Sequence, residues 1–261
     1  MNDGGPASRL LRRLACLRLN EVEPRRGPDG TPWIAKRHRR FARPIIALAN
    51  VYLNLSRAGV RVPGDRLWHA WEREANRHLH GVGCRSEAGG WLLMPRWPGL
   101  PLAEYAGDGR STPEGRLRGL EAATLALREA HRVTLRLPEG GEGLFSHGDA
   151  TLHNVAYDPS TGTARWYDFD TVHAPGLPAV ARHADDLRAL LASAFALLPD
   201  APAPVVFDIV AGAYDGPETW AFLRGLVARG MFHRAAHHRA QATPGEGRLR
   251  ELETLLGTPQ P

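Results

Sequence analysis

Three side chains that carry oxygen ligands stand at short spacing in the second half of the sequence. Asn154 follows Asp149 by five residues, and Asp168 follows Asn154 by fourteen. Val155 to Asp158 and Ala164 to Asp168 have the composition of strands, and the Pro-Ser-Thr-Gly run between them is typical of a turn. Because a hairpin brings its two ends together, we expect Asn154 and Asp168 to lie side by side.

This arrangement suits a hard divalent cation. A carboxamide oxygen and a carboxylate oxygen at neighbouring positions can bind Mg²⁺, which takes few protein ligands and completes its shell with phosphate and water. Asp149 then lies one loop away, where its carboxylate can orient or deprotonate an attacking hydroxyl group. A metal-binding pair with a separate carboxylate is the layout of phosphoryl transfer.

The two motifs resemble those of a known superfamily. The run from His147 to Asn154, followed by Asp168 to Asp170, resembles the catalytic loop and the Asp-Phe-Gly region of the protein-kinase-like superfamily. The His-Gly-Asp form, and an acidic residue in place of the last glycine, are more similar to the aminoglycoside and choline phosphotransferase branch and to bacterial lipopolysaccharide-sugar kinases. The resemblance extends from about Trp33 to Leu191.

This resemblance implies an α+β, bilobal protein-kinase-like fold with a small β-rich N-lobe and a mainly helical C-lobe. Residues 1–94 would form the N-lobe, with antiparallel strands, an inserted helix over Ile45 to Ser56, and a helix like αC of kinases. Residues 95–100 would be the hinge, and residues 101–261 the helical C-lobe with the catalytic loop.

Lys36 is the only lysine, which leaves 32 arginines among the 33 basic residues. It ends the short apolar run Pro32 to Lys36, which resembles the Val-Ala-Ile-Lys strand of kinases. A compact ammonium group and a guanidinium are not interchangeable between phosphates. We therefore interpret Lys36 as functional, although a coding bias that spared one lysine would give the same count.

Such a lysine usually pairs with a carboxylate on a neighbouring helix. Leu67 to Leu79 has helical periodicity, with apolar residues spaced by four along one face. By its similarity to the phosphotransferase αC helix, the segment favours Glu74 as the partner of Lys36, with Glu72 as the alternative.

The resemblance also implies ATP and Mg²⁺ as cofactors in the cleft between the lobes. Lys36, held by Glu74, would contact the α- and β-phosphates, while Asn154 and Asp168 hold Mg²⁺. Asp149 would position the hydroxyl group of the acceptor for in-line attack.

Supporting roles are implied for two further residues. His147 would brace the catalytic loop, and Asp186 would support the same loop by hydrogen bonding. Asp170 would contact a second metal ion or cap the following turn. Thr151 stands where many members of the family place His or Lys, and His153 is a possible substitute.

One part of the kinase pattern is missing from the sequence. No Gly-x-Gly-x-x-Gly motif precedes Lys36, so the phosphates would have to be bound by another backbone segment. This departure favours a pseudokinase that binds nucleotide without turnover, whereas the intact set Lys36, Asp149, Asn154 and Asp168 favours catalysis.

We therefore expect an ATP- and Mg²⁺-dependent phosphotransferase that moves the γ-phosphoryl group to a hydroxyl of a small molecule or sugar. The segment between Asp168 and Asp186 is short and leaves little room for a peptide-docking loop. A serine/threonine protein kinase is the alternative enzyme, and a nucleotide-binding pseudokinase is the alternative without turnover.

Composition limits the partners and the location. The formal charge is +5, and the basic run Lys36 to Arg40 lacks the aromatic interleaving of nucleic-acid modules, so we expect no nucleic acid. Cys16 and Cys84 form no close-spaced motif, which favours a cytoplasmic protein. The longest apolar run, Ala189 to Leu198, is too short to span a bilayer, so no transmembrane segment is expected. Peripheral contact with a membrane remains compatible with the sequence.

Two further patterns have plain interpretations. Gly140 to Gly143 precedes a strand rather than a helix, so a flexible connector is expected there instead of a phosphate loop. His233 and His237 have zinc-ligand spacing on a predicted helix but no third ligand nearby, which favours a surface pair.

Overall fold

The computed structural model describes residues 19–257 apart from residue 28 and residues 230–243. The N-terminal part is built on an antiparallel sheet with the strand order β1-β2-β5-β4. These strands are β1 (Asn20–Arg26), β2 (Pro32–His38), β4 (Arg85–Glu87) and β5 (Trp91–Pro95). Lys36 lies on the central strand β2, opposite Val22 of β1 and Leu92 of β5. Because β2 is paired on both sides, the sheet fixes the position of the Lys36 backbone and the face on which its side chain lies.

Two helices connect β2 to β4. They are α2 (Ala42–Leu55) and α3 (Asp65–His80), and the short strand β3 (Val60–Arg61) lies between them. Trp68, Trp71 and Ala75 place a buried apolar face on α3. The helix ends at Gly81, whose left-handed backbone closes the last turn. Both helices were predicted, the inserted one over Ile45 to Ser56, and both are confirmed.

A second sheet carries the predicted hairpin. Its order is β10-β9-β6, formed by β6 (Leu100–Pro101), β9 (Val155–Asp158) and β10 (Thr163–Trp166). Val155 pairs with Trp166, and the Tyr167 amide donates to the Asn154 carbonyl at 2.9 Å. The hairpin prediction is confirmed, and its two ends meet beside the predicted metal ligands.

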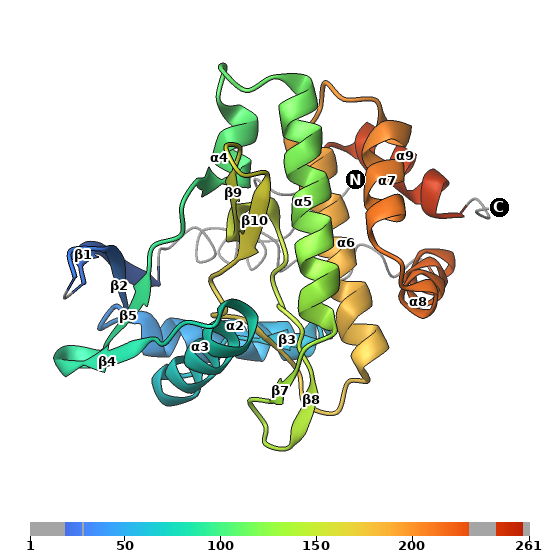
Figure 1. Ribbon diagram of the computed structural model, residues 1–261. Coiled ribbons are helices and arrows are strands. Elements are labelled where there is room, and N and C mark those ends of the chain that lie inside the picture. The colour runs from blue at the N-terminus through green and yellow to red at the C-terminus, as the bar shows by residue number, and fades with distance from the viewer. Residues whose placement is uncertain (1–18, 28, 230–243, 258–261) are drawn as a thin grey trace.

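Two small ribbons and several helices complete the molecule (Figure 1). The ribbons pair β7 (Thr134–Arg136) with β8 (Glu142–Leu144), and β3 with β11 (Val172–His173). The helices are α4 (Leu102–Gly107), α5 (Pro113–His131), α6 (Ala179–Leu197), α7 (Ala203–Ala213), α8 (Pro217–Ala228) and α9 (Glu246–Gly257), with 3-10 turns η1 (Ala88–Gly90) and η2 (Leu152–Asn154). Helix α6 begins five residues before the predicted start at Ala184.

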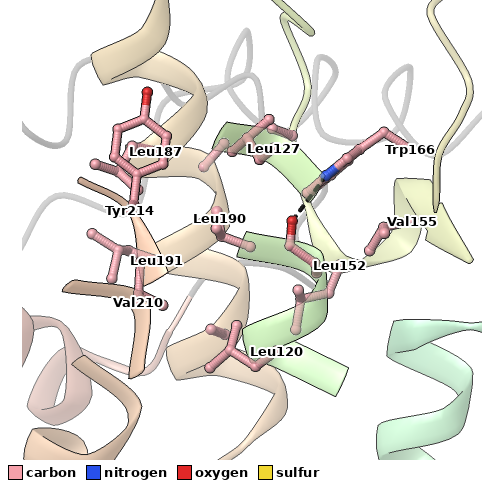
Figure 2. Close-up of a cluster of buried hydrophobic side chains, with 14 of the residues drawn as sticks. Leu120, Leu127, Leu152, Val155, Trp166, Leu187, Leu190, Leu191, Val210 and Tyr214 are labelled. Carbon is pink, nitrogen blue, oxygen red and sulfur yellow. Dashed lines mark hydrogen bonds between the residues drawn. The ribbon is translucent and has the colours of Figure 1, made fainter. Parts of the chain in front are cut away.

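The main core lies where α5 and α6 meet the hairpin (Figure 2). Leucines of both helices pack against apolar side chains of β9, β10 and α7: Leu120, Leu127, Leu187, Leu190, Leu191, Val155, Trp166 and Val210. Trp166 is buried, and its indole nitrogen donates to the Ala123 carbonyl of α5 at 3.0 Å. This bond ties the hairpin, and hence both of its ends, to α5, one of the long helices of the core.

The molecule is thus an α+β protein with a small antiparallel N-terminal part and a mostly helical C-terminal part. This architecture confirms the expected bilobal kinase-like fold. The exact lobe boundaries at residues 94 and 100 stay predictions. Among the described residues, no helix is both long and apolar enough to cross a membrane.

Candidate functional site

Lys36 lies at the centre of the candidate site. Its side chain is only 7% exposed, and its ammonium group forms ion pairs with Asp168 and, at 3.4 Å, with Asp170. The Nζ atom also lies 5.1 Å from the centre of the Trp68 ring. Burial alone would lower the pKa of Lys36, but the charges of Asp168 and Asp170 outweigh it and raise the pKa. The lysine is therefore a fixed, buried positive charge.

Glu72 is the carboxylate of α3 that approaches Lys36. It is fully buried, and it accepts a hydrogen bond from the indole nitrogen of Trp68 at 3.2 Å. Burial raises its pKa to about 7, although the positive charge of Lys36 lowers it. Glu72 is thus a carboxyl group poised between its two protonation states near neutral pH.

Glu74, which was preferred as the partner of Lys36, faces away from it. Its carboxylate lies 3.4 Å from Arg77 and 3.1 Å from His78 on its own helix, and accepts a hydrogen bond from the Arg136 amide at 3.4 Å. Residues two apart on a helix point in directions about 200° apart, so Glu72 and Glu74 cannot both face β2. The structure gives the position beside Lys36 to Glu72.

The second cluster joins the loop before η2 to Asn154, the last residue of η2. The amide nitrogen of Asn154 donates to both the backbone carbonyl and Oδ2 of Asp149, each at 2.8 Å. The two residues are thus held as one unit, with the Asp149 carboxylate in a fixed direction. Asn154 is only 1% exposed, and its carboxamide oxygen Oδ1 is an atom of the kind that a hard cation takes.

His147 braces this loop through both of its ring nitrogens. Nε2 donates to the Tyr167 carbonyl at 3.0 Å, and Nδ1 accepts from the Asp149 amide at 3.3 Å. This pattern requires the neutral ring, and complete burial lowers the pKa of His147 accordingly. The contacts hold the loop to the end of the hairpin, as the resemblance implied.

Asp186 supports the same loop from α6. Its carboxylate accepts from the amides of His147 at 2.7 Å and Gly148 at 2.8 Å, and from Nε2 of His131 at 3.0 Å. Burial alone would raise the pKa of Asp186, but His173 and His131 outweigh it and hold the pKa below its ordinary value. The structure therefore places Asp186 where the prediction put it, beneath the loop.

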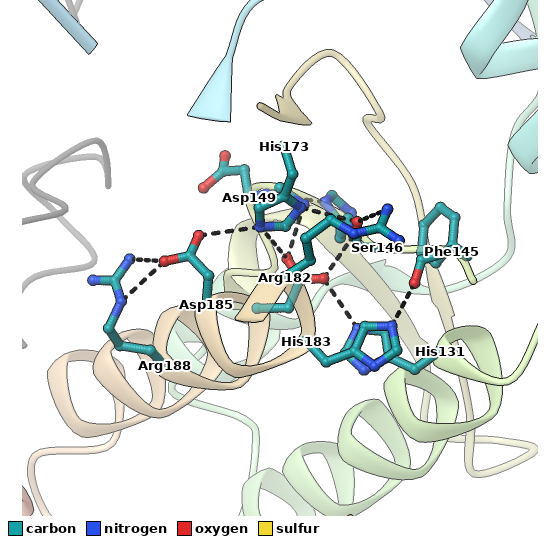
Figure 3. Close-up of polar contacts among 12 residues, drawn as sticks. His131, Phe145, Ser146, Asp149, His173, Arg182, His183, Asp185 and Arg188 are labelled. Carbon is teal, nitrogen blue, oxygen red and sulfur yellow. Dashed lines mark hydrogen bonds and ion pairs between the residues drawn. The ribbon is translucent and has the colours of Figure 1, made fainter. Parts of the chain in front are cut away.

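Several buried polar residues form a network beside Ser146 and Asp149 (Figure 3). His173 contacts Ser146 at 2.9 Å and Asp185 at 3.3 Å, while His183 donates to the Phe145 carbonyl at 2.8 Å. The rings of His131 and His183 stack with centroids 3.9 Å apart. This network connects α5, α6 and β11 to the loop that carries His147 and Asp149, so it holds that loop in place.

Asp168 and Asp170 enter the site from the end of the hairpin. Asp168 has a left-handed backbone with φ of 66°, a conformation that Asp tolerates better than most residues. Phe169 between them is fully buried in the main core, whereas the two aspartates on either side of it face Lys36. Asn20 of β1 donates to Oδ2 of Asp170 at 2.8 Å. Asp170 has its pKa raised to about 6, first by burial and then by the negative charge of Asp168.

The donor set fits Mg²⁺ only together with a further ligand. No group of three or more His, Cys, Asp or Glu side chains in the described part of the chain forms a ready metal site. Asn154 and Asp168 supply oxygen atoms of the kind that Mg²⁺ takes, and this ion binds proteins through one or two carboxylates plus phosphate and water. The residues therefore fit a cation that arrives with a phosphate ligand.

The remaining predictions have mixed outcomes. Thr151 is fully buried and no hydrogen-bond partner of its Oγ1 atom is found in the described residues. Gly140 and Gly141 lie in the β7–β8 turn, in agreement with a connector. His233 and His237 lie outside the described residues.

Sequence reasoning missed two residues that shape the site. Trp68 contacts both Lys36 and Glu72, and its position one helical turn before Glu72 was a signal that could have found it. Asn20 contacts Asp170 across a sequence separation of 150, and no local pattern marks such a contact.

Comparisons with known proteins add little. No protein-family model matches the sequence, and no curated protein is similar to it. Among solved structures, the chain is similar to the complex structure of Rv3197-erythromycin from Mycobacterium tuberculosis, with 14% identity and a TM-score of 0.40. The match covers 92% of this chain and 71% of that chain. A similarity at this TM-score carries no argument about function, so the proposal below rests on the site itself.

Proposed function

We propose that the protein is an ATP- and Mg²⁺-dependent phosphotransferase that transfers the γ-phosphoryl group to a hydroxyl of a small molecule or sugar. The observation that carries the proposal is the ion pair between the buried Lys36 and Asp168. It joins the lysine strand to the hairpin whose other end holds Asn154 and Asp149. A nucleotide-binding lysine, oxygen ligands for a cation and a fixed carboxylate are thereby gathered at one place.

The charge balance of the site supports a bound cation. Asp168 and Asp170 share one lysine, so two carboxylates face a single ammonium group, and burial together with the charge of Asp168 raises the pKa of Asp170. Asn154 and Asp168 would hold Mg²⁺, which when bound neutralises charge on the carboxylates and on the phosphates of ATP.

Lys36 would serve the phosphates of the nucleotide. An ammonium group has three hydrogen-bond donors, so it can stay paired with a carboxylate while it also contacts phosphate oxygens. Its stacking over Trp68 and its burial limit its motion, so little conformational entropy remains to be lost on binding.

Asp149 would act on the acceptor. The hydrogen bond from Asn154 to Oδ2 fixes the direction of this carboxylate, and His147 holds its backbone amide. A carboxylate fixed in this way can orient the acceptor hydroxyl and accept its proton. His147 has both nitrogens engaged, so it does not compete for that role.

The acceptor class follows from the short segment after the metal ligands. Only residues 171–178, which include β11, separate Asp170 from the start of α6. Since β11 pairs with β3, this segment is occupied in the fold and does not form an extended platform for a peptide. A small hydroxylated acceptor is therefore favoured over a protein substrate.

One observation favours a second candidate, a pseudokinase that binds nucleotide without turnover. The sequence ahead of Lys36 lacks a Gly-rich phosphate loop, so charge neutralisation at the γ-phosphate would be weaker than in kinases. Nucleotide binding without turnover in the presence of many acceptor alcohols would support this candidate.

Thermal stability with ATP or GTP, each with and without Mg²⁺, tests the proposal. The wild type should be stabilised only when nucleotide and Mg²⁺ are both present, because binding to the native state raises its stability. Asp168→Asn should lose this shift while keeping its far-ultraviolet circular dichroism. Asp208→Asn, an exposed carboxylate on α7, is the matched control and should behave as the wild type. A full shift in Asp168→Asn would remove Asp168 from the site, and no shift in the wild type at millimolar nucleotide would refute the proposed cofactor.

A further inference from the structure

Helix α2 presents an apolar face that nothing in the described structure covers. Five large apolar side chains of this face are exposed: Phe41 47%, Leu48 47%, Val51 57%, Tyr52 36% and Leu55 77%. With 3.6 residues per turn, they fall within an arc of about 100°. We call these five residues the α2 apolar face.

The α2 apolar face is distinct from the side by which the helix packs. Ala42, Ile46 and Leu53 are the buried residues of α2, and they lie on a different side of the helix, roughly 140° away. Asn50 anchors the helix through two hydrogen bonds to the backbone of Val62, at 2.8 and 2.9 Å. The helix is therefore apolar on two sides, and only one of them is used by the fold.

The polar flank of α2 is also open. An open groove of about 590 Å³ separates this flank from the start of α3, and its lining includes Arg43, Ala47 and Asn50. Helix α2 lies beside α3 in the lower part of the view (Figure 1), with the groove between them. An exposed apolar face of this kind marks a surface that binds a partner.

The charge around α2 is predominantly positive, and the carboxylate of Asp65, which lines the groove beside the helix, is paired with Arg43. No Asp or Glu occurs between Asp29 and Asp65, a stretch that carries Lys36 and six arginines. Arg39 and Arg40 are exposed just before the helix, and Arg57 is exposed just after it. A partner that covers the α2 apolar face must therefore carry negative charge.

This charge disfavours the segments and the second copy of this chain that could otherwise cover the α2 apolar face. Residues 1–18 contain four arginines and one aspartate, and residues 230–243 contain two arginines and no acidic residue. A second copy would bring the same basic surface against this one. Like charges across such contacts disfavour all three.

We propose that α2 docks on the surface of an anionic lipid bilayer. A helix of this length extends over about 21 Å, with an apolar side for the acyl boundary and arginines at both ends for the lipid phosphates. Each basic residue near an anionic surface adds to the attraction, which decays within a Debye length. The distribution of charge at the ends and of apolar side chains between them is that of an interfacial helix.

The position of α2 connects this surface to the candidate site. The helix begins a few residues after the lysine strand β2, and the segment that follows it forms β3. Strand β3 pairs with β11, directly after Asp168 to Asp170. A docked α2 would therefore hold both the lysine strand and the metal-binding segment close to the bilayer.

Sedimentation with vesicles tests the proposal. The full chain should bind phosphatidylcholine vesicles containing about 30% phosphatidylglycerol at least tenfold more strongly than pure phosphatidylcholine, and raising the salt from roughly 0.1 M to 0.5 M should weaken binding. Combining Leu48→Glu with Leu55→Glu should reduce binding by about tenfold or more. Val205→Glu, an apolar residue of α7 that is 40% exposed, is the matched control and should bind as the wild type.

Other results would overturn the proposal. Absence of wild-type binding to anionic vesicles would do so, as would a Leu48→Glu, Leu55→Glu variant that binds as well as the wild type. Light scattering distinguishes a protein occupant, since a wild-type dimer that this variant dissociates would assign the face to a second copy. Because both leucines are exposed, the variant should keep the circular dichroism and unfolding temperature of the wild type, so loss of binding would not reflect unfolding.

Discussion

Glu72 is an acidic residue in an environment that disfavours its charge. Its carboxyl group is fully buried beside a lysine that has two other carboxylate partners. Lys36 pairs with Asp168 and Asp170, and the only hydrogen bond to the carboxyl of Glu72 among the described residues comes from Trp68. A carboxylate that is buried with few donors has its charged form destabilised. Glu72 therefore responds to pH and to whatever occupies the site.

Glu72→Gln should change how stability depends on pH. The pKa of Glu72 rises from an ordinary value of 4.5 to about 7 in the fold, so between these values the native state binds more protons than the unfolded state. The free energy of unfolding should therefore fall as pH rises from 4.5 to 7. Glu72→Gln removes this loss and should be more stable than the wild type at pH 8, by on the order of 2 kcal/mol. Urea unfolding at pH 5 and pH 8 measures the difference.

Glu74→Gln is the matched control on the same helix. Its carboxylate forms partly exposed pairs with Arg77 and His78, and such pairs contribute within about 1 kcal/mol. The control should shift stability slightly and by similar amounts at both pH values. A larger pH-dependent effect from Glu74→Gln than from Glu72→Gln would contradict the assignment of Glu72 to the lysine.

At the scale of elements, the loop that carries His147 and Asp149 depends on one close approach of backbone to backbone. Gly148 has φ of 84°, and a Cβ atom added to it would lie 2.7 Å from the Thr171 carbonyl oxygen. The loop before η2 therefore touches the segment that leads into β11. This contact, with the bonds from Asp186, sets how far the Asp149 loop lies from the end of the hairpin.

Gly148→Ala should be destabilising because it combines an unfavourable backbone conformation with a clash. We expect a loss of roughly 2–4 kcal/mol in the free energy of unfolding. Gly140→Ala is a matched control, since Gly140 also has positive φ, at 94°, but an added Cβ would meet no atom within 4 Å. The control should lose only about 1 kcal/mol. Equal losses in the two variants, measured by denaturant unfolding, would show that the approach to Thr171 is not restrictive.

The elements of the site were predictable where the signal is local. The hairpin follows from its turn chemistry and strand-like composition, and α2 and α3 follow from helical periodicity. The rotation of α3 about its axis could not be predicted in the same way. The helix buries Glu72 along with Trp68 and Trp71, so its buried face is not a purely apolar stripe in the sequence. The contact of Asn20 with Asp170 and the pairing of β3 with β11 depend on tertiary packing, which leaves no trace in local sequence.

At the scale of the whole molecule, burial of neutral histidines opposes the effect of Glu72. His131, His147 and His183 are buried, and burial lowers the pKa of each, that of His183 to about 4. As pH falls from 6.5 to 4, these histidines bind protons in the unfolded chain but not in the native state. The free energy of unfolding therefore decreases. Protonation of Glu72 adds stability over part of the same range.

These opposing effects make the pH profile of stability a test of the whole arrangement. His183→Gln should lose less stability than the wild type between pH 6.5 and 4.5, by roughly 2 kcal/mol, because one histidine no longer resists protonation. Glu72→Gln should lose more over the same range, since its stabilising proton uptake is gone. His78→Gln, on the partly exposed end of α3, should follow the wild type. Unfolding free energies at four pH values would measure the slopes, and parallel curves for His183→Gln and Glu72→Gln would contradict opposite roles for the two groups.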